Sequence, residues 1–292
     1  MIRPPQSALQ LAPICAVILI AFAANSVLNR MALVSGDTGP AAFAALRILS
    51  GAAMLVFLVM RGKGGVRRLA TGLRWQNAAA LATYVLGFSF AYVTLDAGLG
   101  ALILFGVIQI TMFAGSILAR EDIPPRRWLG AGLAFFGLVW LLLPSGSTAP
   151  PLAGAAMMTV AAIGWGVFSL QGRGAKDPLA ITAGSFTLAI IPGLAVLAFT
   201  GLDGINAQGA ALAVASGAIT SGLGYALWYR LLPQIDSSIA AVLQLTVPVI
   251  VMVGGMIFLS EAMTLRLLIA TLLVLGGVAL AVTSPSAPAR RG

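Results

Sequence analysis

Histidine is absent from this chain of 292 residues, and cysteine occurs only once, at Cys15. Without histidine, the chain has no histidine base, histidine metal ligand or histidine proton relay. A single cysteine excludes an internal disulfide framework and a cysteine metal cluster. Charged residues make up only 9% of the chain, against about a quarter in soluble domains. We therefore predict that the protein is not an enzyme and that it uses no cofactor or metal.

Apolar sequence dominates instead, since 60% of the residues are hydrophobic and the mean hydropathy is +1.02. Apolar runs of about 18 or more residues are typical of membrane-spanning helices. The runs are continuously apolar rather than alternating, which favours helices over a β-barrel. The sequence predicts an all-α integral membrane protein with ten transmembrane helices. They are expected at 11–32, 41–60, 76–95, 98–118, 126–143, 152–171, 178–200, 208–231, 237–259 and 264–283.

The net charge is +9, and the basic residues are distributed unevenly among the predicted loops. With both termini in the cytoplasm, 14 of the 17 Lys and Arg residues lie in cytoplasmic segments. The exceptions are Arg30 and Arg266 in outer segments and Arg47 within the second span. This asymmetry follows the positive-inside rule. We predict a bacterial-type inner (plasma) membrane protein with both termini cytoplasmic and with no nucleic-acid partner.

Two stretches, ILAREDIPPRRWL and FLSEAMTLRLL, each place a glutamate five positions before an arginine. The pairs are Glu121 with Arg126 and Glu261 with Arg266, and they lie 140 positions apart. Charged residues are scarce in this chain, so matching contexts at such a distance indicate an internal duplication.

An ungapped comparison of 96–137 with 236–277 gives eleven identities in 42 positions, three of them charged residues. We predict a first five-helix repeat at 1–144, a linker at 145–150 and a second repeat at 151–292. Five is an odd number, so the second repeat must cross the membrane in the opposite sense. Inverted-topology repeats are the architecture of many secondary transporters, with the substrate site near the midplane between the halves.

Particular residues carry a family resemblance: GPAAFAALRILSGAAML at 39–55, and the two glutamate turns followed by GAGLAFFGL and LLVLGGVALA. Pro248, thirteen residues before Glu261, fits the same pattern, whereas Ile108 departs from it in the first half. The chain resembles the drug/metabolite transporter superfamily, specifically its EamA-type ten-helix exporters, and is similar to the YddG-type exporters of aromatic amino acids. The resemblance implies a ten-helix basket around a central cavity, with export as the direction of transport.

Polar and aromatic side chains within the spans are the candidate substrate-binding residues, because polar groups at membrane depth usually face a cavity or a partner helix. An asparagine amide both donates and accepts, which suits a zwitterion, and a tryptophan face attracts a cation. The alternatives are interhelical hydrogen bonding, packing and an interfacial aromatic belt. The candidates are Asn25, Asn29, Tyr84, Phe88, Gln109, Trp165, Ser169, Ser221, Tyr225, Trp228 and Gln244.

Four further residues are candidates for gating or structural roles. Arg47 attracts a carboxylate in the outer vestibule, or it snorkels or pairs with a loop acid such as Asp37 or with a carbonyl, and we favour the second interpretation. Glu121 and Glu261 begin the fifth and tenth predicted helices, where a carboxylate complements the positive end of the helix dipole. Pro248 acts as a gating hinge or as a static kink.

No acidic residue lies at the centre of a predicted span, so we expect facilitated movement rather than proton coupling. The predicted function is a secondary transporter that exports small amphipathic metabolites, foremost neutral or aromatic amino acids, by alternating access. The alternatives are an exporter of lipophilic or quaternary cationic drugs and a non-transporting membrane scaffold or receptor. We expect a small-molecule substrate and the lipid bilayer as partners, and a monomer as the functional unit.

Overall fold

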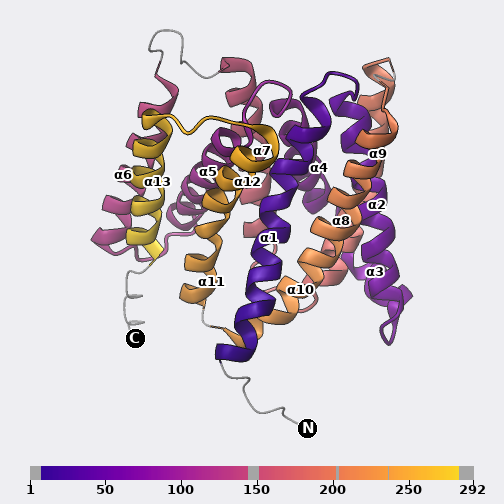
Figure 1. The fold of residues 1–292 in the computed structure, drawn as a ribbon. Coiled ribbons are helices and arrows are strands. Elements are labelled where there is room, and N and C mark those ends of the chain that lie inside the picture. Colours follow the sequence, from indigo (N-terminus) through magenta and orange to yellow (C-terminus); the bar gives the residue numbers. More distant parts are fainter. Residues whose placement is uncertain (1–7, 144–150, 202–203, 236, 283–292) are drawn as a thin grey trace, which may run out of the picture.

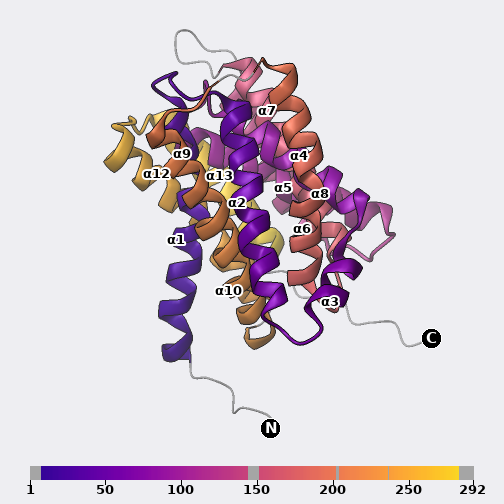
Figure 2. The ribbon, with the colours of Figure 1, turned by 90° about the vertical axis from the view of Figure 1, so that its right-hand side faces the viewer.

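The computed structural model describes residues 8–143, 151–201, 204–235 and 237–282, so the predicted linker 145–150 lies outside the described residues. All regular structure in these ranges is helical, and Figures 1 and 2 show the bundle from two sides. The elements are α1 (Ala8–Leu33), α2 (Pro40–Met60), α3 (Gly65–Gly72), α4 (Trp75–Ala91), α5 (Ala97–Leu118), α6 (Pro125–Leu142), α7 (Leu152–Gln171), α8 (Pro178–Phe199), α9 (Ala207–Val214), the π-helix η2 (Ala215–Leu223), α10 (Gly224–Leu231), the 3₁₀-helix η3 (Leu232–Gln234), α11 (Ser237–Gln244), α12 (Thr246–Leu259) and α13 (Leu265–Val282).

Eight helical segments in the described part of the chain are long and apolar enough to cross a membrane. They correspond to α1, α2, α5, α7, α8, the continuous segment Ala207–Gln234, the segment Val242–Leu259 and α13. The predicted spans 76–95 and 126–143 are also helical, as α4 and α6. However, α4 has only 17 residues, and α6 opens with a proline and two arginines. The protein is therefore an integral membrane protein, and the count of ten spans stays a prediction.

The predicted ninth span, 237–259, is broken between α11 and α12. Pro248 has no N–H to donate to the Gln244 carbonyl, and its ring clashes with that carbonyl in a continuous helix. The α-helical pattern therefore ends at Gln244, and the Leu245 N–H donates instead to the Val242 carbonyl at 3.1 Å. The break turns α11 into a short separate helix at the lower end of the bundle in Figure 1.

The predicted eighth span, 208–231, contains the π-helix η2 between α9 and α10. η2 lies directly against α2, because a Cβ at Gly217 would overlap the Arg47 carbonyl oxygen and the Ser50 hydroxyl. Only glycine permits so close an approach of two helix backbones. π-Helical segments inside α-helices often occur at functional sites, and η2 carries three buried hydroxyl residues, Ser216, Thr220 and Ser221.

The turns after α5 and after α12 have the same backbone form. Arg120 (φ 53°) and Ser260 (φ 55°) are the two non-glycine residues with positive φ in the described ranges, and each directly precedes a glutamate. The two residues are separated by 140 positions. In Figure 1, α1 begins and α13 ends at the lower end of the bundle.

Candidate functional site

A cavity of about 840 Å³ lies among the helices of the described bundle, within the roughly 300–1,000 Å³ typical of small-molecule sites. Its deep part is lined from α1 and α4, by residues such as Asn25 and Tyr84. Its lining continues to the ends of α6, α7 and α13, where Arg127, Arg173 and Val282 lie. The cavity therefore reaches from the middle of the bundle to the end that carries Glu121.

Aromatic side chains from four helices form one continuous wall of this cavity. The Trp165 ring stacks on Tyr225 at 5.4 Å between centroids and with an interplanar angle of 22°, and Tyr84 lies 4.8 Å from Trp165. Phe22 of α1 joins Tyr225 at 5.7 Å and Trp228 at 5.8 Å. The aromatic wall, comprising Phe22, Tyr84, Phe88, Trp165, Tyr225 and Trp228, offers ring faces to an aromatic or aliphatic ligand.

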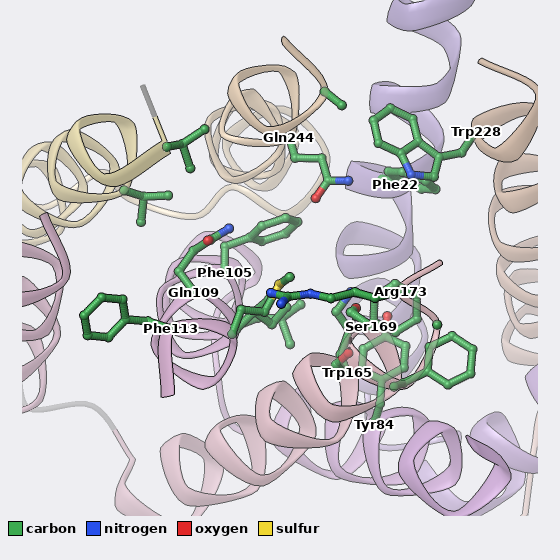
Figure 3. A pocket seen from close by; sticks show the side chains of 18 of the residues that line it. Phe22, Tyr84, Phe105, Gln109, Phe113, Trp165, Ser169, Arg173, Trp228 and Gln244 are labelled. Atoms are coloured by element: carbon green, nitrogen blue, oxygen red, sulfur yellow. Dashed lines mark hydrogen bonds between the residues drawn. The ribbon is translucent and has the colours of Figure 1, made fainter. Parts of the chain in front are cut away.

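Two amides extend into the same space from α5 and α11. Figure 3 shows Gln109 and Gln244 with Phe105 between them. Neither amide makes a hydrogen bond within the described part of the chain, so both can bind a polar ligand. The Ser169 hydroxyl also lines the cavity, but it donates to the Trp165 carbonyl of its own helix at 2.8 Å.

Asn25 connects the cavity to the π-helix. Its Oδ1 accepts hydrogen bonds from Thr220 at 2.6 Å, from Ser216 at 2.8 Å and from Ser221 at 3.4 Å. The amide oxygen is thus fully engaged, and the NH₂ group is the part left to a ligand. Asn29, one turn further along α1, donates to Ser89 at 3.2 Å.

Arg47 is fully buried, with 0% exposure, behind the aromatic wall and beside the hydroxyl groups of Tyr84 and Ser221. Its Nη2 donates to Tyr84 Oη at 3.2 Å and to Ser221 Oγ at 3.5 Å. Its Cζ lies 5.0 Å from the Phe88 ring centroid and 5.4 Å from the Tyr84 centroid. The favoured expectation is wrong, because within the described residues Arg47 neither snorkels to solvent nor pairs with a loop acid such as Asp37 or with a carbonyl.

The two repeated glutamates lie at opposite ends of the bundle. Glu261 accepts hydrogen bonds from Ala97 N at 2.7 Å and Gly98 N at 3.3 Å, so it caps α5, and Arg30 Nε lies 4.0 Å from its Oε1. Burial raises the pKa of Glu261. The expectation that Glu261 caps its own following helix is wrong, since Thr264 Oγ1 accepts from the Leu267 N–H at the start of α13.

Glu121 occupies a different environment, at the cavity mouth. Its Oε1 accepts from Arg173 Nη1 at 3.1 Å, and both side chains are more than two-fifths exposed. Arg173 itself lines the cavity and lies across it in Figure 3. An exposed pair of this kind contributes about 0–1 kcal/mol, so Glu121 and Arg173 hold the mouth only weakly.

Most of the candidate binding residues line this one cavity. Those that do are Asn25, Tyr84, Phe88, Gln109, Trp165, Ser169, Tyr225, Trp228 and Gln244. Asn29 and Ser221 are fully buried and are absent from the lining. Of the gating or structural candidates, Pro248 is buried in α12. Sequence reasoning missed Phe22 and Arg173; Phe22 lies three positions before Asn25 on the same helical face, which is a signal that could have identified it.

An all-helical bundle in the membrane with a central small-molecule cavity defines a polytopic protein of the transport class. Residues 152–283 match the EamA-like transporter family. An uncharacterized protein of Pseudomonas aeruginosa, PA1977, is 47% identical over 266 residues, covering 90% of this chain and 91% of that protein. An uncharacterized transporter of Archaeoglobus fulgidus is 25% identical over 252 residues, covering 82% and 87%.

One solved crystal structure superimposes with a TM-score of 0.63 at 20% identity, covering 91% of this chain and 97% of the other, which shows a shared fold. The chain belongs to the EamA-like transporter family of the drug/metabolite transporter superfamily, and it is a membrane transporter.

Proposed function

We propose that the protein is a secondary transporter that exports small amphipathic metabolites, foremost neutral and aromatic amino acids. The observation that carries this proposal is the composition of the cavity. The aromatic wall faces the unpaired amides of Gln109 and Gln244, and no Asp, Glu or Lys is among the described lining residues. A ring or aliphatic side chain suits the wall, while the polar end of an amino acid suits the amides.

The absence of acidic lining residues also separates this proposal from export of lipophilic cations. Ring faces attract a cation, but a desolvated cationic substrate usually needs a carboxylate to offset its lost hydration. The described lining instead carries two cations of its own, Arg127 and Arg173. A YddG-type substrate range, with aromatic amino acids, is therefore the finer assignment that we propose.

Alternating access by two inverted repeats, 1–144 and 151–292, completes the proposal. Support comes from the left-handed residues Arg120 and Ser260, placed 140 positions apart in matching turns. In this arrangement α4 and α6 are the two further spans, which gives ten, and both termini are cytoplasmic at the inner membrane. Each repeat then contributes side chains to the aromatic wall and one of the two amides. Rocking of the halves moves the opening of the cavity from one side to the other.

The contacts of the two glutamates support a second feature of the same mechanism. Glu261 of the second half meets Arg30 and the α5 N-terminus of the first half, whereas Glu121 of the first half meets Arg173, just after α7 of the second. One end is sealed by a half-buried carboxylate, and the other end leads into the cavity. With cytoplasmic termini, this is the inward-open state of a transporter that acts as a monomer in the bilayer.

Counterflow in proteoliposomes tests the proposed function. Labelled phenylalanine is expected to accumulate in vesicles preloaded with unlabelled phenylalanine, and an ATP-independent signal identifies a secondary transporter. Trp165→Ala is expected to raise the apparent KM by roughly two- to tenfold, because an aromatic pair contributes about 0.5–1.5 kcal/mol. Trp140→Ala is the matched control, since Trp140 is two-fifths exposed and does not line the cavity. Absence of counterflow across a panel of neutral amino acids would refute the proposal.

A further inference from the structure

Arg47 is the largest fully buried side chain in the described protein, and it lacks a counter-ion there. Its Nε and Nη1 atoms are buried and have no hydrogen-bond partner. These two nitrogens together carry three N–H groups. A buried guanidinium without an acidic partner is strongly destabilising, so its presence in the membrane-spanning bundle indicates a function. The neutral groups that hold it, Tyr84 Oη and Ser221 Oγ, satisfy only Nη2.

The guanidinium lies one aromatic ring away from the cavity. Its Cζ is 5.0 Å and 5.4 Å from the ring centroids of Phe88 and Tyr84, and both rings line the deep end of the cavity. A second connection runs through Ser221, whose hydroxyl lies within hydrogen-bond distance of both Arg47 and the cavity-lining Asn25. Tyr84 and Ser221 are therefore the groups that stand between Arg47 and a ligand in the cavity.

The charged residues that line the described cavity are basic, although Glu121 pairs with one of them, Arg173, at the mouth. Arg127 and Arg173 lie at the mouth, Arg47 lies behind the deep end, and the described lining contains no acidic residue. Clefts with walls of low dielectric focus such a field and concentrate ligands of opposite charge. A guanidinium binds a carboxylate with charge-assisted hydrogen bonds. One buried arginine matches one carboxylate, whereas a phosphate, with its greater charge, usually meets a cluster of cations.

We propose that Arg47 is the receptor for the carboxylate of the transported molecule, and that this protein selects carboxylates with an apolar body over the corresponding amines and amides. This inference rests on the proposed function and names the part of the substrate that the site requires. The Tyr84 hydroxyl serves as a neutral acceptor for Arg47 while the cavity holds no carboxylate. The substrate carboxylate displaces this hydroxyl, and the aromatic wall holds the apolar body.

Four ligands that share a phenyl ring separate the charges. They are phenylalanine, 3-phenylpropanoate, phenethylamine and phenylalaninamide. Binding is measured by the thermal stabilisation of the purified transporter in detergent, and transport by competition with counterflow of labelled phenylalanine. The two carboxylates are expected to stabilise and compete, whereas the amine and the amide are expected to do neither at the same concentration.

Variants of Arg47 then test its role directly. Arg47→Gln is expected to weaken carboxylate binding by about ten- to a hundredfold, the usual range for a lost charge-assisted hydrogen bond, and to abolish the preference over the amide. Arg47→Lys is expected to retain part of the preference. Arg230→Gln is the matched control, because Arg230 is exposed on α10 and does not line the cavity.

Tyr84→Phe keeps the ring and removes the competing hydroxyl, so it is expected to tighten carboxylate binding several-fold. This variant keeps the inference testable if Arg47→Gln does not fold, since a purely structural Arg47 predicts no gain. Equal stabilisation by the acid and the amide in the unmodified protein would overturn the inference. That result, with phenylalanine counterflow intact, would leave the proposed function standing. Stabilisation by the carboxylates alone, without any counterflow, would support the role of Arg47 and contradict the proposed transport function.

Discussion

At the scale of single residues, Glu261 gives stability a distinct pH dependence. Burial raises its pKa above the ordinary value for a glutamate, against the lowering effect of hydrogen bonds from the Ala97 and Gly98 backbone N–H groups. A group whose pKa is higher in the folded than in the unfolded state contributes stability that is fully present below the unfolded pKa. That contribution is lost as the pH rises through the raised folded pKa. Acid therefore favours the buried position of Glu261, which closes one end of the bundle.

We expect the Tm in detergent to fall as the pH rises through the raised pKa of Glu261, and we expect Glu261→Gln to remove this decrease. Asp177 provides a control of opposite sign. A hydrogen bond from Arg68 lowers its pKa below 3.8, so its stabilisation is present above that value and is lost as the pH falls. Asp177→Asn should therefore change only the acid limb of the curve. A Glu261→Gln profile parallel to that of the unmodified protein would contradict the assignment.

Single-residue reasoning from sequence identified the cavity side chains whose chemistry is conspicuous in lipid. Asn25 and Gln109 stand out because an amide at membrane depth is costly unless it faces a cavity or a partner. The chemistry of Phe22 does not distinguish it, since a phenylalanine suits lipid and cavity alike, as Phe199 at 90% exposure illustrates. Only its position on the helical face of Asn25 indicates that it lines the cavity. Asn29 shares a helical face with Asn25, but it does not line the cavity. Residue spacing predicts the direction in which a side chain leaves the helix, and it does not predict whether other side chains separate that residue from the cavity.

At the scale of elements, the close contact between η2 and α2 determines where Arg47 is held. The contact depends on Gly217, whose position has no room for a methyl group beside the Arg47 carbonyl. Gly217→Ala is expected to lower stability by about 1–3 kcal/mol, as overpacking in a closely packed interior does. Gly276→Ala is the matched control, because α13 offers open space there, and alanine favours a helix by about 0.5–1 kcal/mol.

Thermal unfolding in detergent measures both glycine variants, and the expected order of Tm is Gly276→Ala at or above the unmodified protein, then Gly217→Ala below it. Carboxylate binding gives an independent measurement, since a displaced α2 moves Arg47 away from Tyr84. Equal Tm values for Gly217→Ala and Gly276→Ala would show that η2 and α2 have more freedom than their contact indicates.

Element boundaries show where sequence patterns fail. The apolar run 237–259 reads as one helix, yet Pro248 ends α11 at Gln244. The effect of proline on the preceding turn is local and was available from the sequence. The π-helix η2 was not, because its widened turn depends on tertiary contacts, namely the hydroxyls of Ser216 and Thr220 meeting Asn25 from α1.

At the scale of the whole molecule, hydropathy predicted the helical membrane bundle because lipid requires every backbone polar group to be satisfied within a helix. Length and apolarity also distinguish α4 and α6 from the other spans. α4 has 17 residues, fewer than the roughly 18 expected of a membrane span, and the first turn of α6 contains Arg126 and Arg127. Neither length nor apolarity reveals which end of a cavity is closed. That property depends on contacts such as Glu261 with Ala97, which join residues 164 positions apart.

Inverted topology makes a prediction about opposite membrane faces. Asp122 and Ala262 lie 140 positions apart, each directly after a repeated glutamate, and both are exposed. In a Cys15→Ala background, Asp122→Cys is expected to react with a membrane-impermeant thiol reagent only in inverted vesicles. Ala262→Cys should react only in intact cells, because an odd number of crossings separates equivalent turns.

Two reference positions calibrate this labelling, Lys63→Cys for the cytoplasmic face and Asp37→Cys for the outer face, and both residues are exposed in their loops. Labelling of Asp122→Cys together with Lys63→Cys, and of Ala262→Cys together with Asp37→Cys, is the expected pattern. If Asp122→Cys and Ala262→Cys reacted from one side, an even number of crossings would separate them. The two halves would then be parallel, and the sealed and open ends formed by Glu261 and Glu121 could not exchange roles during transport.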